Sequence, residues 1–164
     1  MKTLVLIRHA KSDWQDSEIK DFDRPLSDRG NADAPVMAKE LHRLGLKPDL
    51  IISSPANRAI TTAGFFARKF GYSEDKIKQE AIIYNGSYQN YIQVINSVNN
   101  DIDCIFLLGH NPEISVTASC LLNNFYEQVP TAACICIDFD IDDWNEIETE
   151  KGKLRFFLYP KMIK

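Results

Sequence analysis

Apolar residues in this chain gather in short unbroken runs that do not alternate with polar residues. Three of these runs lie within residues 2–8, 50–52 and 102–108. Continuous apolarity over such short lengths is typical of strands that are covered on both faces, as in a parallel sheet between two layers of helices. We therefore expect three buried strands that run parallel to one another.

Between the first two strands, apolar residues recur at the spacing of an amphipathic helix. This stripe predicts a helix over residues 34–44, in which Pro35 is tolerable only near the first turn because proline lacks a backbone N–H. The residues of the stripe are Ala34, Met37, Ala38, Leu41 and Leu44.

Capping signals predict three more helices. Ser54-Pro55 combines an N-cap residue with a first-turn proline, so a helix is expected from there until Gly71 closes it. Ser87 precedes another apolar stripe, and Asn111-Pro112 repeats the cap-then-proline pattern.

The pattern changes after Pro130, where residues 133–139 and 154–159 are predicted to be strands. The acidic stretch 138–150 between them is expected to be a solvated loop, with a docking surface as the alternative, and Gly152 to make a turn. These elements together predict one domain over residues 1–164, a three-layer α/β/α sandwich with a mostly parallel central sheet.

Composition and charge exclude several functions. The chain is 45% hydrophobic and 26% charged, which is ordinary for a globular protein, and its formal net charge is −4. Without a basic surplus we expect no nucleic-acid binding, so an anionic ligand has to meet a local cationic pocket. The apolar run at the N-terminus is too short for a signal peptide or a membrane span, and we expect no membrane association.

Cysteine and histidine spacing gives no sign of a metal or cofactor. Four cysteines lie in apolar stretches without CxxC spacing and are expected to be buried free thiols, with Cys134 and Cys136 on one face of a strand. The chain is therefore expected to be reduced and cytoplasmic. The histidines lack metal-ligand spacing, Arg8 beside His9 would repel a cation, and no Gly-rich phosphate loop is present.

Arginine and histidine residues follow three of the predicted strands at the point where each strand ends. Arg8 and His9 end the first strand, Arg58 follows the second, and His110 follows the strand at 102–108. Ligands of open α/β sheets bind at the carboxyl ends of the strands, and two of these segments also open helices whose N-terminal amides favour anions. The sequence therefore predicts a phosphate pocket.

The order of these segments resembles the histidine phosphatase superfamily. The resemblance rests on Leu6-Ile7-Arg8-His9-Ala10, Arg24-Pro25-Leu26-Ser27, Ser54-Pro55 with Arg58 and Thr62-Ala63, and Gly109-His110-Asn111-Pro112. Four segments in this order are far more specific than an isolated Arg-His pair. The short chain and the Arg-His-Ala-Lys-Ser opening resemble the SixA-type phosphohistidine phosphatase branch most closely, which implies a phosphoglycerate mutase-like fold.

The resemblance also implies roles for individual residues. His9 would attack phosphorus and form a phosphohistidine intermediate that water then cleaves, with no cofactor. Arg8 and Arg58 would hold the phosphoryl oxygens, and His110 would donate to the same oxygens in the transition state. Ser12 and Gln15 would add polar contacts near the mouth of the pocket.

Two further basic residues have simpler interpretations. Arg24 could reach the edge of the pocket, or it could pair with Asp21 or Asp23 and staple the loop, and we expect the second arrangement. His42 lies on the polar side of a predicted helix and is expected to have no special role.

The expected proton donor is absent. Relatives that cleave phosphate esters usually place a glutamate after the third strand, but this chain has Asn85 at the edge of the pocket, and an amide cannot act as a general acid. Four carboxylates remain open as substitutes: Glu80, Asp13, Asp21 and Asp23. A missing acid favours P–N bonds, because an imidazole leaving group can take its proton from solvent.

These observations predict a phosphatase that acts on phosphohistidine in a protein domain. The chain lacks the long insertion that larger relatives fold over small esters, and an open pocket suits a protein substrate. Phosphoglycerate mutase activity is disfavoured, because an uncovered pocket would lose the released product to water. The alternatives are a phosphatase for a small phosphomonoester such as a sugar phosphate, and a weakly active module that binds a phosphorylated partner.

Overall fold

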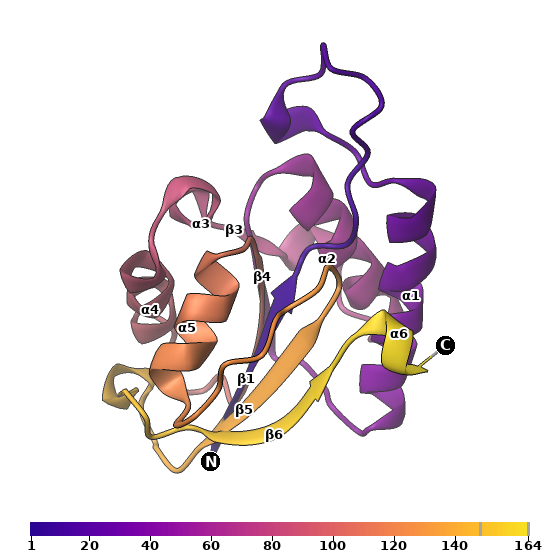
Figure 1. The fold of residues 1–164 in the computed structure, drawn as a ribbon. Coiled ribbons are helices and arrows are strands. Elements are labelled where there is room, and N and C mark those ends of the chain that lie inside the picture. The colour runs from indigo at the N-terminus through magenta and orange to yellow at the C-terminus, as the bar shows by residue number, and fades with distance from the viewer. Residues whose placement is uncertain (148, 164) are drawn as a thin grey trace.

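The computed structural model describes residues 1–147 and 149–163, and its strands form one six-stranded sheet in the order β3-β2-β4-β1-β5-β6 (Figure 1). β1 to β4 pair in parallel, whereas β5 runs antiparallel to both β1 and β6. The expected mostly parallel sheet is confirmed. The strands are β1 (Lys2–Arg8), β2 (Leu50–Ser53), β3 (Lys78–Gln79), β4 (Cys104–Gly109), β5 (Cys134–Phe139) and β6 (Lys153–Leu158).

Helices cover both faces of the sheet, as predicted. In Figure 1, α1, α2 and α6 lie against one face, and α3, α4 and α5 lie against the other. The loops contain short 3₁₀ turns, which are η1 (Asp21–Asp23), η2 (Glu74–Lys76) and η3 (Trp144–Glu146). The helices are α1 (Asp28–Arg43), α2 (Asn57–Lys69), α3 (Ala81–Asn85), α4 (Tyr88–Asn96), α5 (Glu113–Leu121) and α6 (Pro160–Ile163).

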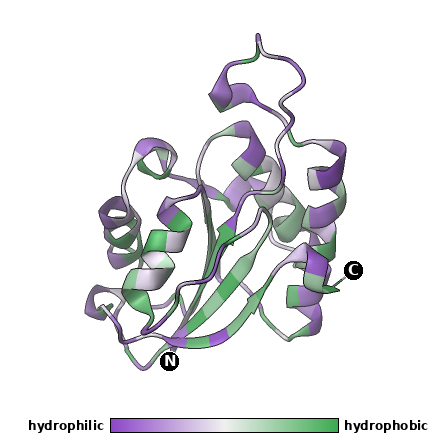
Figure 2. Cartoon of the chain, in the orientation of Figure 1, coloured by the Kyte–Doolittle hydropathy of each residue, from purple (hydrophilic) through white to green (hydrophobic). Residues whose placement is uncertain are grey.

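The central strand β1 explains the unbroken apolar runs of the sequence. Leu4 and Leu6 point into the core under α4 and α5, whereas Val5 and Ile7 point into the core under α1 and α2. Because successive side chains of a strand face opposite ways, the middle of a strand with helices on both sides is apolar at consecutive positions. Figure 2 shows this concentration of apolar residues on the sheet.

Two predicted helix starts were wrong. α1 begins at Asp28, six residues before the apolar stripe, because the Ser27 hydroxyl caps it by accepting from the Gly30 N–H (3.1 Å). Pro35 therefore lies inside the helix and not in its first turn. At its other end, Leu44 is the C-cap residue and is exposed.

α2 begins at Asn57 and not directly after Ser54. The Ser54 hydroxyl accepts from the Ala56 N–H (3.2 Å) in the turn before the helix, while Gly71 follows the helix end at φ +66°, as predicted. α5 begins one residue after Pro112, and the Asn111 side chain accepts from the Ser115 N–H (3.2 Å).

The predictions for the remaining segments are confirmed in part. Ser87 caps α4 in a capping box with Asn90, as expected. The acidic stretch is not simply a solvated loop, since it contains the end of β5 and the turn η3 with its fully buried Trp144; residue 148 lies outside the described residues. Gly152 pairs with Leu122 in an isolated parallel bridge and does not make a simple turn.

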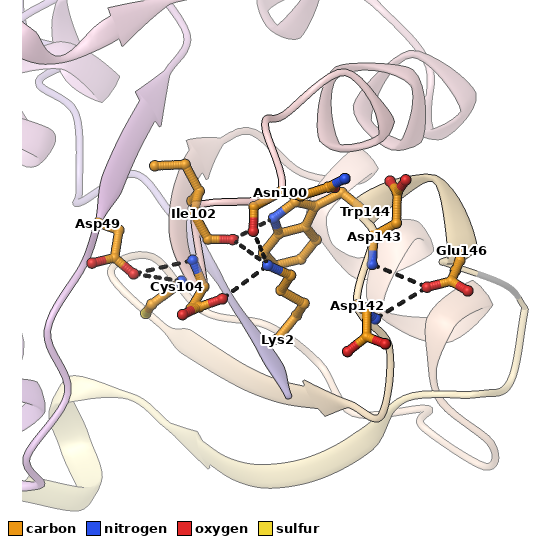
Figure 3. Close-up of polar contacts among 10 residues, drawn as sticks. Lys2, Asp49, Asn100, Ile102, Cys104, Asp142, Asp143, Trp144 and Glu146 are labelled. Carbon is orange, nitrogen blue, oxygen red and sulfur yellow. Dashed lines mark hydrogen bonds and ion pairs between the residues drawn. The ribbon is translucent and has the colours of Figure 1, made fainter.

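At the amino end of β1, Lys2 makes polar contacts with the loop that precedes β4 (Figure 3). Its ammonium group is buried and donates to the carbonyl oxygens of Asn100 and Ile102 and to the Asp103 carboxylate (2.8 Å). The Trp144 indole donates to the same Ile102 carbonyl (2.8 Å), so Lys2 and Trp144 fasten the loop that precedes β4.

All four cysteines are free thiols, but only three are buried. Cys104, Cys134 and Cys136 lie in the core, and Cys134 and Cys136 share the cluster under α1 and α2, as expected from their spacing. Cys120 is half-buried, which differs from the prediction. Among the described residues, no helix has both the length and the apolar character needed to cross a membrane.

Candidate active site

The topology brings together the segments that follow β1, β2 and β4, because these three strands are neighbours in the sheet. The ladder continues past the strand ends, since the His9 N–H donates to the Gly109 carbonyl (3.1 Å) and the Ser54 N–H to the Leu108 carbonyl (3.0 Å). The ring centroids of His9 and His110 consequently lie 5.1 Å apart.

His9 has the protonation state of a nucleophile. Its Nδ1 lies 2.7 Å from the Ala10 carbonyl, which can only accept, so Nδ1 carries the proton and Nε2 presents its lone pair. Burial lowers the pKa of His9 to about 4, and Arg58 and Arg8 act in the same direction against the Ala10 hydrogen bond and the Asp21 charge. The ring is therefore neutral near pH 7.

Thr62 holds the segments of His9 and Arg58 together. Its hydroxyl accepts from the Ala10 N–H (3.0 Å) and donates to the Arg58 carbonyl one helical turn earlier (2.7 Å). From the sequence, Thr62 was predicted only as part of a motif, and its spacing of four residues from Arg58 is the signal from which this contact could have been inferred.

The two arginines of the predicted pocket have different partners. Arg58 is buried and donates from Nη1 to the Asp21 carbonyl (2.7 Å) and from Nη2 to the Asp21 carboxylate (3.0 Å). Arg8 donates from Nη1 to the Val129 carbonyl (2.8 Å), and its buried Nε has no partner within the described chain. Burial lowers the pKa of Arg8, yet its charge still lowers that of His9.

His110 is also a neutral, buried imidazole. Its Nε2 lies 2.8 Å from the Ser54 hydroxyl, and its Nδ1 has no hydrogen-bond partner among the residues that the structure describes. Burial, His9 and Arg58 lower the pKa of His110 to about 3. An unsatisfied buried ring nitrogen beside His9 is a ready contact for an oxygen of a ligand.

A buried tyrosine fixes the backbone of His110. The Tyr91 hydroxyl accepts from the His110 N–H (3.1 Å) and donates to the Ile83 carbonyl (3.2 Å). A Cβ on Gly109 would lie 2.5 Å from the same hydroxyl, so only glycine fits beside it. The sequence indicated Tyr91 only as an apolar helix residue, because its partner is distant in sequence.

Asp21 and Tyr84 join the site from two other segments. The Asp21 carboxylate accepts from the Tyr84 hydroxyl (2.7 Å) as well as from Arg58, and the Tyr84 ring lies edge-on to His110 with 5.7 Å between centroids. Asp21 was one of four carboxylates left open by the sequence, whereas Tyr84 was not singled out at all.

The structure does not bring the other predicted residues to this cluster. Ser12 is buried in a bridge with Leu26, and the exposed Gln15 borders a separate surface hollow. Asn85 is exposed at the end of α3. In the described chain, no hydrogen bond or ion pair joins these three side chains to His9, Arg58 or His110.

Arg24 staples the loop, as expected. It donates to the Asp13 carbonyl (3.2 Å), its Nε lies 4.0 Å from the Asp21 carboxylate, and its guanidinium lies 3.6 Å from the centre of the Trp14 ring. His42 is exposed beside Phe70 and takes no part in the site.

The electrostatic character of the cluster suits an anion. The cluster contains two guanidinium groups, two neutral imidazoles and one carboxylate, and arginine side chains are well suited to bind a phosphoryl dianion. Within the described residues, no group of three or more His, Cys, Asp and Glu side chains could hold a metal ion.

Comparisons with known proteins identify the family that the chain resembles. The family model of the histidine phosphatase superfamily (branch 1) matches residues 4–83. An uncharacterised chloroplastic protein of Arabidopsis thaliana is 37% identical over 128 residues, which cover 73% of this chain and 59% of that protein. The chain spans less than two thirds of the length of the first curated relatives that it matches.

Solved structures match over nearly the whole chain. A protein of Agrobacterium tumefaciens assigned as the phosphohistidine phosphatase SixA has a TM-score of 0.82 at 27% identity and covers 97% of this chain and 98% of its own. The protein histidine phosphatase SixA in complex with tungstate has a TM-score of 0.83 at 16% identity, with 99% of each chain covered, and this likeness concerns the fold alone.

Proposed function

The chain belongs to the histidine phosphatase superfamily, and from this premise we propose that it is a metal-independent phosphatase whose His9 takes up the phosphoryl group. The observation that carries the proposal is the state of His9 itself. Its ring is buried, neutral and held through Nδ1, so that Nε2 is free to attack beside two arginines and His110.

In the proposed first step, Nε2 of His9 forms a bond to phosphorus as the bond to the leaving group breaks. The guanidinium groups of Arg8 and Arg58 neutralise the charge on the phosphoryl oxygens, which is most of what such a reaction requires of a protein. If the Ser54 hydroxyl donates to Nε2 of His110, then Nδ1 of His110 carries an unpaired N–H, and a phosphoryl oxygen would supply its partner.

We propose protein phosphohistidine as the substrate and the cytoplasm as its location. Asn85 supplies no acid, and an imidazole leaving group needs none from the protein. The loop between β1 and α1 rises beyond the end of the sheet (Figure 1) and carries the exposed Trp14 and Phe22, whose apolar surfaces suit a macromolecular partner. The free thiols in the core support a reducing compartment.

A trapping experiment tests the reaction. The protein is mixed with a ³²P-labelled histidine-phosphorylated protein domain, quenched in alkali, and analysed for acid-labile phosphate on His9. We expect label on the parent chain and on His42→Ala, which lacks a histidine remote from the site, and none on His9→Ala. Hydrolysis by His9→Ala at the parent rate would refute the mechanism, and phosphate-dependent binding with background turnover would identify a binding module instead.

A small phosphomonoester remains the second candidate, because Asp21 and Tyr84 place groups able to move protons beside Arg58. Specificity constants for sugar phosphates, phosphoramidate and the phosphohistidine protein decide between the two. A higher value for any ester than for the protein would replace the leading substrate.

A further inference from the structure

Contacts from α2 and α3, together with Arg24 of its own turn, hold the carboxylate of Asp21 at the site. Arg58 on α2 binds both its carbonyl and its carboxylate, Tyr84 on α3 donates to the carboxylate, and Arg24 lies on its other side. These contacts place the carboxylate beside Arg58 and beside the hydroxyl of Tyr84, whose ring packs on His110.

The two carboxylate oxygens of Asp21 have different environments. Oδ2 accepts from both Tyr84 (2.7 Å) and Arg58 (3.0 Å), whereas within the described chain Oδ1 accepts no hydrogen bond and has Arg24 Nε at 4.0 Å, beyond hydrogen-bond length. The side chain is 49% exposed. Oδ1 therefore keeps its lone pairs free, and water can reach it.

The other carboxylates that the sequence left open do not reach the cluster. Asp13 accepts from the Gln15 N–H in its own loop, and Glu80 pairs with Lys78 on β3. The Asp23 side chain makes no hydrogen bond or ion pair within the described chain. Among the described residues, Asp21 is thus the one candidate of the four that contacts Arg58.

Asp21 is ionised at neutral pH and can accept a proton but has none to give. Partial burial by itself would raise its pKa, yet the hydrogen bonds from Tyr84 and Arg58 and the nearby cations hold the pKa below its ordinary value. Its negative charge in turn partly opposes the lowering of the pKa values of His9 and His110. The carboxylate therefore lies close enough to influence both rings.

We propose that Asp21 is the general base of the second step, in which water cleaves the phosphorylated His9; this inference rests on the proposed function. The water oxygen forms a bond to phosphorus as the P–Nε2 bond breaks, and the electron pair of that bond returns to Nε2. The proton of the water passes to Oδ1 of Asp21 and then to solvent. Inorganic phosphate and the free imidazole of His9 are the products.

This role agrees with the absent acid at Asn85. The leaving group of the first step and the water of the second occupy the same position opposite His9, so one residue faces both. An ionised Asp21 assists the water but does not protonate a leaving alkoxide, and an imidazole leaving group does not require it to. An ionised Asp21 therefore favours substrates with P–N bonds over esters, and it still assists the hydrolysis of phosphorylated His9.

The lifetime of the phosphorylated enzyme tests this inference. The protein is phosphorylated with ³²P-labelled phosphoramidate, the donor is removed, and the alkali-stable label on His9 is followed with time. We expect Asp21→Asn to form the intermediate at close to the parent rate and to lose it about 10²-fold more slowly or worse, the usual size of a general base contribution. Asp23→Asn, two residues away in the same turn, is the matched control and keeps the parent lifetime.

Further variants separate catalysis from positioning. Asparagine still accepts from Arg58, so Asp21→Asn leaves Arg58 in place, and Asp21→Glu, which keeps a carboxylate, is expected to recover part of the decay rate. Equal losses in formation and decay in Asp21→Asn, or a decay at the parent rate, would overturn the role of Asp21 alone. Absence of label on His9 in the parent would instead overturn the proposed function itself.

Discussion

At the residue scale, two buried hydroxyl groups hold the candidate site together, and each takes part in two hydrogen bonds. Thr62 joins Ala10 to the first turn of α2, and Tyr91 joins His110 to the carbonyl of Ile83 just before Tyr84. Neither hydroxyl is placed to touch a substrate. Their effect on catalysis therefore has to pass through the positions of His9 and His110.

Tyr91→Phe tests this positioning directly. The ring still fills its place in the core, but the His110 N–H and the Ile83 carbonyl lose their shared partner. Buried groups left unpaired typically cost about 1–3 kcal/mol each, so for these two groups we expect the free energy of unfolding to fall by about 2–6 kcal/mol. Urea denaturation measures it, and phosphorylation of His9 should slow at the same time.

The control for Tyr91→Phe is Tyr126→Phe, which removes an exposed hydroxyl that makes no hydrogen bond in the described chain. Its stability and its rate of His9 phosphorylation should match those of the parent. A stable Tyr91→Phe protein with the parent rate would show that the backbone of His110 does not depend on this hydroxyl.

The depressed pKa of His9 also makes stability depend on pH. Above its ordinary pKa of 6.5 the ring is neutral in both the folded and the unfolded chain, so it has no effect. Between pH 6.5 and about 4 the unfolded chain binds a proton that the folded chain does not, and the free energy of unfolding falls as the pH falls.

Replacing His9 with glutamine removes this contribution. Between about pH 7 and about pH 5, His9→Gln should therefore lose less stability than the parent, as measured by urea denaturation at each pH. His110 acts in the same direction and is present in both proteins, so the difference reports on His9. Identical losses in the two proteins would contradict a buried neutral His9.

Residues adjacent to strand ends were the predictable part of the site. His9, Arg58 and His110 follow runs whose apolarity marks them as central strands, and parallel strands deliver their carboxyl ends to one edge. Asp21 and Tyr84 lie in a loop and a short helix that have no periodic pattern. Their meeting is decided by tertiary packing over 63 residues of sequence, which no local signal reports.

At the element scale, strands were easier to predict than helix starts, and the reason is physical. Burial on both faces produces a continuous run of apolar residues in β1, whereas the start of a helix depends on which side chain caps it. Ser54 has the composition of an N-cap, but its hydroxyl is engaged by Ala56 and His110, and α2 begins three residues later. The tertiary hydrogen bonds of its hydroxyl override the local preference of the residue.

At the opposite end of β1, Lys2 has a structural role in joining this strand to the loop that precedes β4. Lys2→Met removes an ammonium group that donates to two carbonyl groups and to Asp103, and the Asn100 carbonyl is left without this donor. We expect a loss of about 1–3 kcal/mol in the free energy of unfolding by urea denaturation. The rate of His9 phosphorylation should not change, because Lys2 lies at the edge of the sheet away from the site.

Lys39→Met, on the exposed face of α1, is the matched control and should leave stability within about 0.5 kcal/mol of the parent. If Lys2→Met and Lys39→Met were equally stable, the buried hydrogen bonds of Lys2 would contribute nothing net.

At the scale of the whole molecule, the charge of the protein and the charge of its pocket have opposite signs. The net charge is −4, yet His9 lies between two arginines. Long-range attraction of an anionic substrate is therefore weak, and selectivity falls to the surface around the pocket. We expect that surface to include the projecting loop, which Figure 2 shows as mainly polar, with the exposed Trp14 and Phe22 as exceptions.

Trp14 is the residue whose loss should separate a protein substrate from a small one. It is 64% exposed and lies on Arg24, which adjoins Asp21, so a partner whose phosphate reaches His9 would cover it. Buried tryptophans at interfaces commonly contribute about 2 kcal/mol or more, so Trp14→Ala should lower kcat/KM for the phosphohistidine protein at least tenfold. Phosphoramidate is too small to reach Trp14, and its kcat/KM should change less than about threefold.

Leu44→Ala is the control for Trp14→Ala, since Leu44 is an exposed apolar residue at the far end of α1 and should leave both substrates unaffected. A parallel loss for both substrates in Trp14→Ala would mean that the tryptophan acts through Arg24 and Asp21 on the chemistry. No loss for either would mean that the partner approaches the pocket from another side. Only a loss confined to the protein substrate would identify the projecting loop as a recognition surface. The ratio of the kcat/KM values for the two substrates distinguishes these three outcomes without reference to absolute activity.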